Sequence, residues 1–129
     1  MKEYTVRTQS RVELLNIDRE VEEAVRSSGV KEGVCVIFVP HTTAAVTINE
    51  NADPAVGKDI IAKLGKLIPP NEGYAHLEGN SDAHIKSSLV GCSLSLIVSG
   101  GRAMLGTWQS VFFCEFDGPR TRKVWIEVG

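Results

Sequence analysis

The sequence predicts an α+β fold: a single domain with a largely antiparallel β-sheet or sandwich and about three helices. Three observations lead to this prediction. The candidate elements follow the order β-β-α-β-β-α-α-β-β-β, and short turns join neighbouring strands, which favours antiparallel pairing. The length of 129 residues, 43% of them hydrophobic, suffices for one core. Residues 1–129 are therefore expected to form one domain.

Strand and helix signals alternate near the N-terminus. Residues 4–8 and 12–15 are expected to pair as two strands around a turn at residues 9–11. Asp18 can then cap a helix that carries Val21, Ala24 and Val25 on one face. This helix is expected to end at Ser27-Ser28-Gly29.

Two more strands follow. The continuous apolar run at residues 34–39 predicts a central strand that is covered on both faces. Pro40 closes this run and places His41 directly after a core strand. Residues 44–48 predict the next strand, which ends at a polar segment.

Two further helices are expected in the middle of the chain. Asp53 can cap the first, and Pro54 occupies its favoured first position. The apolar residues of this helix recur at helical spacing, at Val56, Ile60, Leu64 and Ile68. Asn80 or Ser81 can cap the second, whose inward-facing residues are expected to be Ile85 and Leu89.

The C-terminal third is expected to be β. Residues 94–98 predict a strand, and residues 104–116 predict a long one with Trp108 on its core side. Residues 117–120 predict a turn, and residues 123–128 the last strand.

Charge and composition exclude several classes of function. A net charge of −2 and a pI near 5.9 give no electrostatic basis for binding nucleic acid or an anionic membrane. No apolar run approaches the roughly 20 residues that span a bilayer, and the N-terminus lacks a signal-peptide core. Cys35 and Cys114 fit buried positions, Cys92 less clearly, and no disulfide framework is implied. A cytoplasmic protein is expected.

The candidate chemistry concentrates in residues 76–84, which hold His76, Glu78, Asp82 and His84. His41 lies in a second polar segment. Polar groups gathered in this way bind or react, or remain in solvent. Three histidines are enough for a zinc-type site with an open position, and nearby carboxylates extend the choice to manganese or magnesium. The alternative is that the histidines have ordinary capping and surface roles.

Other polar residues allow both a functional and a structural interpretation. Glu50, Glu78 and Asp82 are the candidate acid–base groups, although Asp82 could equally be a helix-capping charge. Arg120 and Arg122 alternate onto one side and suit a phosphate or carboxylate, or else form a solvated hairpin edge. The remaining candidate substrate-binding residues are Thr42, Thr43, Asn49, Asn51, Asn80 and Gln109.

Five segments together carry a family resemblance that covers essentially the whole chain. They are HTTA at 41–44, INENADP at 48–54, HLEGNSDAH at 76–84, LGTWQ at 105–109 and EFDGPR at 115–120. In this order they closely resemble the YjbQ-like family, which is often labelled secondary thiamine-phosphate synthase and is otherwise uncharacterised.

The resemblance implies an α+β homotrimer with a divalent metal, most simply zinc, held by His41, His76 and His84. It also implies a transferase activity that joins a pyrimidine diphosphate to a thiazole phosphate and releases pyrophosphate. Residue chemistry alone mildly prefers a metal-assisted hydrolase of a phosphoester or related bond. No glycine-rich phosphate loop is present, and a three-histidine site resembles a zinc hydrolytic centre more than a magnesium–diphosphate clamp. A non-catalytic trimer that binds a metal or ligand is the third hypothesis.

Overall fold

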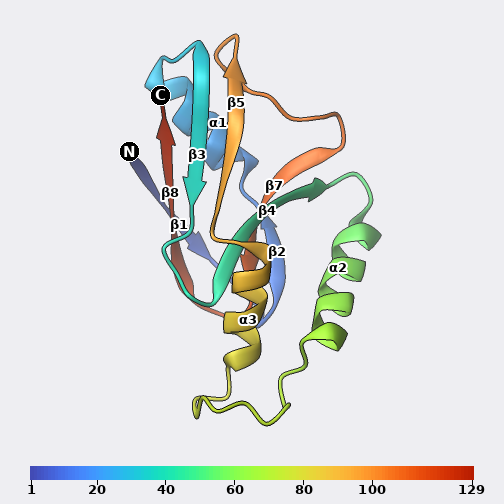
Figure 1. Ribbon diagram of the computed structural model, residues 1–129. Coiled ribbons are helices and arrows are strands. Elements are labelled where there is room, and N and C mark those ends of the chain that lie inside the picture. Colours follow the sequence, from blue (N-terminus) through green and yellow to red (C-terminus); the bar gives the residue numbers. More distant parts are fainter.

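Eight strands form two antiparallel sheets in the computed structural model, which describes residues 1–129 (Figure 1). The first sheet has the strand order β1 (Lys2–Arg7), β8 (Thr121–Val128), β3 (Glu32–Phe38), β5 (Ser93–Ser99) and β6 (Arg102–Ala103). The second sheet has the order β2 (Glu13–Asn16), β7 (Gln109–Glu115) and β4 (Ala44–Glu50). The three helices are α1 (Asp18–Ser28), α2 (Pro54–Leu67) and α3 (Ser81–Val90). The predicted α+β fold with antiparallel sheets is confirmed.

The main core lies between the two sheets and α1. Its largest fully buried side chains include Phe113 of β7, Ile37 of β3 and Val21 of α1. A smaller cluster fills the other face of the second sheet, where Ala83 of α3 packs near Phe116. Because α3 lies on this sheet, its N-terminal end is fixed close to the turn between β7 and β8 (Figure 1).

The expected N-terminal hairpin is not formed, and this prediction was wrong. β1 pairs with β8, with Tyr4 opposite Val124, whereas β2 pairs with β7, with Leu14 opposite Cys114. The chain crosses from one sheet to the other between residues 8 and 12. A turn signal marks a change of direction but does not say which strand becomes the neighbour.

β3 is central in its sheet, between β8 and β5, but only one of its faces is covered. Val34, Val36 and Phe38 are all exposed on the other face, and Phe38 stacks on Trp125 with ring centroids 5.7 Å apart. The expectation of cover on both faces was therefore wrong for the isolated chain.

The second and third helices occur where expected but pack differently. Asp53 caps α2 by accepting a hydrogen bond from the Ala55 amide at 2.9 Å, yet no residue within α2 is buried. In α3 the expected inward residues Ile85 and Leu89 are 42% and 60% exposed. The buried face of α3 instead carries Asp82, Ala83, Lys86 and Ser87.

The long strand expected at residues 104–116 is shorter in the structure. Only Gln109–Glu115 is strand, and Trp108 is 64% exposed in the preceding loop, so its core assignment was wrong. Cys35 and Cys114 are buried as expected, while Cys92 is exposed. None of the helices is long and apolar enough to cross a membrane.

Candidate functional site

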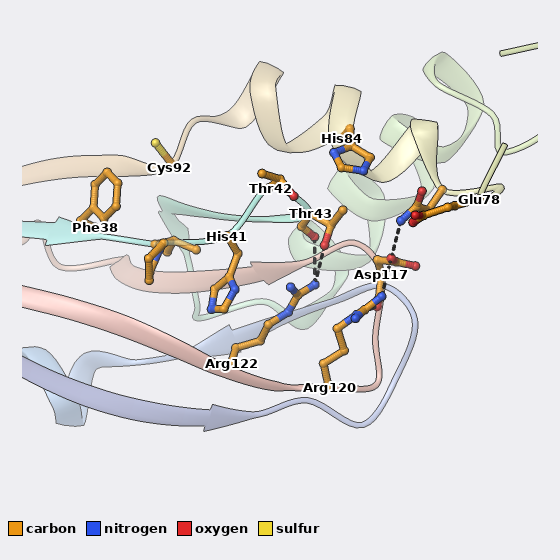
Figure 2. Close-up of a pocket in the computed structure, with 13 residues that line it drawn as sticks. Phe38, His41, Thr42, Thr43, Glu78, His84, Cys92, Asp117, Arg120 and Arg122 are labelled. Carbon is orange, nitrogen blue, oxygen red and sulfur yellow. Dashed lines mark hydrogen bonds and ion pairs between the residues drawn. The ribbon is translucent and has the colours of Figure 1, made fainter. Parts of the chain in front are cut away.

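An open cleft of about 590 Å³ lies where three chain segments meet (Figure 2). The first is the link from β3 to β4, which carries His41, Thr42 and Thr43. Pro40 ends the strand pattern there, so this link crosses between the two sheets at the edge of the cleft. The other two segments are the residues before and within α3 and the β7–β8 turn with the start of β8; they contribute Glu78, Asn80, His84, Asp117, Arg120 and Arg122.

Arg122 is the most firmly held of the basic side chains on this cleft. Its Nε donates to Glu115 Oε1 at 2.9 Å, and its Nη2 donates to Glu115 Oε2 and to Thr43 Oγ1, the latter at 2.9 Å. The Arg122 residue is 4% exposed and Glu115 is fully buried. A two-pronged arginine–carboxylate pair of this kind fixes the orientation of the guanidinium plane.

Both carboxylate oxygens of Glu115 accept hydrogen bonds from other neighbours besides Arg122. Thr8 Oγ1 donates to Oε1 at 2.8 Å, and the Asp117 amide donates to Oε2 at 3.0 Å. Burial alone would raise the pKa of Glu115, but the hydrogen bonds from Arg122, Asp117 and Thr8, together with the charge of Arg122, lower it below its ordinary value. Glu115 is therefore ionised at neutral pH and holds Arg122 from behind.

This arrangement leaves one end of the Arg122 guanidinium group free. Nε and Nη2 are engaged by Glu115 and Thr43, whereas Nη1 has no hydrogen-bond partner in the chain. Since Arg122 lines the cleft, Nη1 is the edge that can donate to a ligand there.

Arg120 lies beside Arg122 on the same wall of the cleft, and Figure 2 shows both arginines on one side with His84 on the other. Its Nη2 lies 2.9 Å from Asp117 Oδ2, and its Nε donates to the Asp117 carbonyl at 2.8 Å. Asn80 Nδ2 donates to the same Asp117 oxygen at 2.9 Å. Asp117 thus ties the start of α3 to the β7–β8 turn and orients Arg120.

His41 presents a single hydrogen-bonding group to the cleft. Its Nε2 accepts a hydrogen bond from the Lys123 amide at 2.9 Å, which assigns the proton of the neutral ring to Nδ1. Burial and then the charge of Arg122 lower the pKa of His41 below its ordinary 6.5, against the opposing charge of Glu115. At neutral pH the ring is uncharged and Nδ1–H is a donor.

His84 and His76 lie together. Their ring centroids are 5.4 Å apart in an edge-to-face arrangement, and His76 Nε2 is 3.7 Å from Glu78 Oε2. His84 and Glu78 line the cleft, whereas His76 does not. His84 and Glu78 therefore lie on the wall opposite the arginines.

The three histidines do not form one metal site within the chain. No group of three or more histidine, cysteine, aspartate or glutamate side chains is arranged to hold a metal ion. His41 offers no lone pair, because Nε2 accepts the Lys123 amide and the neutral ring has its proton on Nδ1. The donor set that remains is His76 and His84 with Glu78 nearby.

Several expected site residues lie away from the cleft. Glu50 and Asn51 line a separate groove beside α2, and the Asn49 side chain accepts a hydrogen bond from the Glu50 amide. Gln109 closes its own loop by accepting from the Gly106 amide at 2.8 Å. None of these four contributes to the cleft.

The Asp82 side chain is buried and paired with basic residues, and it is not accessible to a ligand in the cleft. Its carboxylate is fully buried, accepts two hydrogen bonds from Arg11 at 3.1 and 3.3 Å, and lies 3.5 Å from Lys86 Nζ. Although burial alone would raise its pKa, the hydrogen bond and charge of Arg11 and the charge of Lys86 lower it. Asp82 does not line the cleft, so its charge holds α3 in place.

Two site residues escaped the sequence analysis as individual candidates: Glu115 and Asp117. Glu115 is the single charged residue in the run from Val111 to Phe116. A lone acid in a core strand needs a buried partner, and this signal could have paired it with a nearby arginine. Asp117 follows this run of residues and was assigned only to a turn.

Fold and cleft together define an α+β protein with an open polar site where loops meet α3 and the start of β8. The family described as UPF0047 protein YjbQ-like matches residues 2–129. A UPF0047 protein of Methanocaldococcus jannaschii is 56% identical over 125 residues, which cover 97% of this chain and 91% of that protein. YugU of Bacillus subtilis, also a UPF0047 protein, is 48% identical and covers 99% and 98% of the two chains.

Solved structures of YjbQ/UPF0047 proteins have the same fold as this chain. A YjbQ/UPF0047 protein of Clostridium acetobutylicum superposes with a TM-score of 0.98 at 49% identity and full coverage of both chains. A YbjQ-like protein of unknown function from Sulfolobus solfataricus gives a TM-score of 0.94 at 35% identity, with 98% and 94% covered. The chain belongs to the YjbQ/UPF0047 family.

Proposed function

We propose that this chain is a small-molecule enzyme whose cleft binds a phosphorylated substrate. The form that we name is the secondary thiamine-phosphate synthase reaction, in which a pyrimidine diphosphate and a thiazole phosphate are joined and pyrophosphate leaves. The observation that carries the proposal is the orientation of Arg122, held by Glu115 and Thr43 with Nη1 left free at the cleft. Donors that are fixed before a ligand arrives suit developing negative charge on an oxygen.

Three donors from two chain segments support an oxyanion site. Arg122 Nη1, the Arg120 guanidinium group and His41 Nδ1–H all belong to residues on the cleft. Arginine binds phosphate oxygens through its planar fork, and a neutral imidazole N–H adds a donor without adding charge. Glu115 offsets the charge of Arg122, so the site favours hydrogen bonding over simple charge attraction.

The opposite wall supplies groups that can move a proton. His84 and Glu78 line it, and His76 lies close to both. In the proposed reaction the ring nitrogen of the thiazole phosphate bonds to the pyrimidine carbon that carries the diphosphate. The bond from that carbon to the diphosphate oxygen breaks, and pyrophosphate leaves with the electron pair, stabilised by the arginine wall. His84 is the candidate that donates a proton to the leaving pyrophosphate.

A divalent metal ion is a further prediction, and no step of the proposed reaction depends on it. His76 and His84 could supply two nitrogen ligands to zinc, with Glu78 near His76, and manganese or magnesium would need more oxygen ligands. Within one chain this set is short of a complete site, so a further ligand would have to come from a neighbouring subunit or from substrate.

A homotrimer belongs to the same proposal. The outer face of the first sheet exposes Val34, Val36, Phe38 and Ile97, the last at 68%. Apolar side chains gathered on one sheet face favour contact with another protein surface. Phe38 also lines the cleft, so a neighbouring subunit placed on this face would adjoin the site.

Hydrolysis of a phosphoester or related bond is the second candidate. Glu78 and His84 on the wall opposite the arginines favour it, since such a pair can activate a water molecule. A trimer that binds a phosphorylated ligand without turnover is the non-catalytic alternative.

The test measures pyrophosphate release by purified protein with both precursors, with each precursor alone and with a panel of phosphoesters. The proposal expects release only when both precursors are present, and its loss in His84→Ala. Arg120→Met should raise KM, whereas Arg102→Met, which changes an exposed arginine away from the cleft, should leave KM unchanged. Turnover of single phosphoesters would favour the hydrolase, and binding without any turnover the non-catalytic alternative. Undiminished release in His84→Ala would contradict the role of that histidine.

A further inference from the structure

The arginine wall of the cleft is backed by the segment in which the chain crosses from β1 to β2. The Thr8 amide donates to the Arg120 carbonyl at 2.9 Å, and the Gly118 amide donates to the Arg11 carbonyl at 3.0 Å. A Cβ atom at Gly118 would clash with the Ser10 carbonyl oxygen and would lie 2.9 Å from Thr8 Oγ1. The crossing segment and the β7–β8 turn are therefore in direct contact behind the site.

The Thr8 hydroxyl group joins the supports of both arginines. It accepts a hydrogen bond from the Arg120 amide at 2.8 Å. It donates to Glu115 Oε1 at 2.8 Å, and the Arg120 carbonyl at 3.1 Å is the alternative acceptor. The carboxylate is the stronger acceptor of the two, because it is ionised. One side chain thus holds both the backbone of Arg120 and the carboxylate that orients Arg122.

Thr8 has no direct access to a ligand. The residue is 7% exposed and does not line the cleft. Thr5, three residues earlier in β1, is exposed instead, and its Oγ1 accepts a hydrogen bond from Lys123 Nζ at 3.0 Å. Any effect of Thr8 on binding must therefore pass through the arginines that it supports.

We propose that Thr8 is a positioning residue of the oxyanion site, which places Arg120 beside Arg122. The inference rests on the proposed phosphate site and adds a residue that sets its geometry. Thr8 acts chiefly through Arg120, because Glu115 keeps its hydrogen bonds from Arg122 and Asp117 when the threonine hydroxyl is lost. The Arg120 amide, by contrast, loses its acceptor, and the residue that begins the arginine wall is free to shift.

Calorimetric titration with pyrophosphate compares the wild type with Thr8→Val, Thr8→Ser and Thr5→Val. Thr8→Val keeps the shape of the side chain but removes the hydroxyl, and it should bind about 3- to 10-fold more weakly, the range for one neutral hydrogen bond. Thr8→Ser keeps the hydroxyl and should bind as the wild type does. Thr5→Val, the matched control, makes the same change at the exposed threonine of β1 and should also leave affinity unchanged.

The same replacement in the Arg120→Met background separates positioning from a general loss of structure. Because Thr8 acts through Arg120, Thr8→Val should change pyrophosphate affinity by less than about 2-fold in that background. An equal loss in both backgrounds would assign Thr8 to the support of the fold alone and would refute the proposal.

A measurement on the unaltered protein requires no variant to fold. In amide NMR spectra pyrophosphate should shift the signals of Arg120 and Thr8, which are hydrogen-bonded to each other, and leave that of Tyr4, which lies opposite Val124, unchanged. An unshifted Thr8 signal with pyrophosphate bound, or full affinity in Thr8→Val, refutes the role of Thr8 while the oxyanion site stands. If the wild type does not bind pyrophosphate, the proposed function fails and this inference fails with it.

Discussion

Replacing Glu115 by glutamine tests whether the buried acid holds the site together. Each oxygen of Glu115 accepts two hydrogen bonds, Oε1 from Thr8 and Arg122 Nε and Oε2 from the Asp117 amide and Arg122 Nη2. A glutamine in either orientation places its own NH2 group against two of these donors. The variant therefore loses two hydrogen bonds and leaves the charge of Arg122, which is 4% exposed, without its partner.

The expected cost is large. Two bonds that involve a charged group contribute about 1.5–3 kcal/mol each, and breaking a buried ion pair costs about 3–5 kcal/mol, so we expect a loss of about 3–5 kcal/mol in the free energy of unfolding. Urea denaturation at pH 7 measures it. With a urea slope of about 1–3 kcal/mol per molar, the midpoint should fall by roughly 2 M.

Two controls separate this explanation from a general effect of losing an acid. Glu127→Gln removes a carboxylate that is 65% exposed and paired with the N-terminus, and it should change stability by less than about 1 kcal/mol. The double variant Glu115→Leu/Arg122→Met should be more stable than either single replacement, because no unpaired charge stays buried. A Glu115→Gln protein within about 0.5 kcal/mol of wild type would refute the reasoning.

Three further outcomes are expected. His41 should titrate by NMR with a midpoint below pH 6.5, because its pKa is lowered in the folded protein. The stability that it contributes is therefore present above pH 6.5 and is lost as the pH falls through the folded-state pKa. Arg122→Met should move the midpoint upward, and a wild-type midpoint at or above pH 6.5 would contradict the assigned environment. Asp82→Asn should cost about 3–5 kcal/mol in urea denaturation, because Lys86 stays buried without its partner, yet it should leave phosphate binding unchanged; weakened binding in the folded variant would return Asp82 to the site. Zinc titrated into the protein should shift the ring signals of His76 and His84 before that of His41, and an early shift of His41 would contradict its hydrogen-bonded tautomer.

Local signals in the sequence were sufficient for most elements. Asp53 followed by Pro54 marks a helix start, and the structure has the expected cap. The polar segments after β3 and before α3 do line one cleft. Pro40 ends β3 beside the C-terminal end of α3, where the Val39 amide donates to the Cys92 carbonyl at 2.7 Å. Arg120 and Arg122, two residues apart, reach the same cleft as alternation predicts.

Partners distant in the sequence were not predictable in this way. Residues 4–8 and 12–15 have the pattern of a hairpin, but their true partners lie more than 95 residues away, beyond the reach of any turn signal. The inward face of α3 was assigned to Ile85 and Leu89, although the structure buries Asp82 and Lys86 there. That exchange depends on Arg11, whose side chain reaches Asp82 only in the folded chain.

The metal site also depended on a contact between residues distant in the sequence. Three histidines in polar segments satisfy the composition of a zinc site, but the sequence does not say which ring nitrogen is free. The Lys123 amide, from a strand 82 residues away, decides this for His41. Glu115 was overlooked, because an isolated acid in an apolar run does not indicate a site until its arginine partner is known.

Binding of pyrophosphate, measured by calorimetry, tests the central claim that the arginine wall is an oxyanion site. Arg120 is exposed and its replacement spares the buried Glu115–Arg122 pair, so Arg120→Met should fold normally and bind about 10-fold more weakly or worse. Arg102→Met should bind as the wild type does. Equal affinity in all three proteins, or no binding to the wild type, would contradict the account.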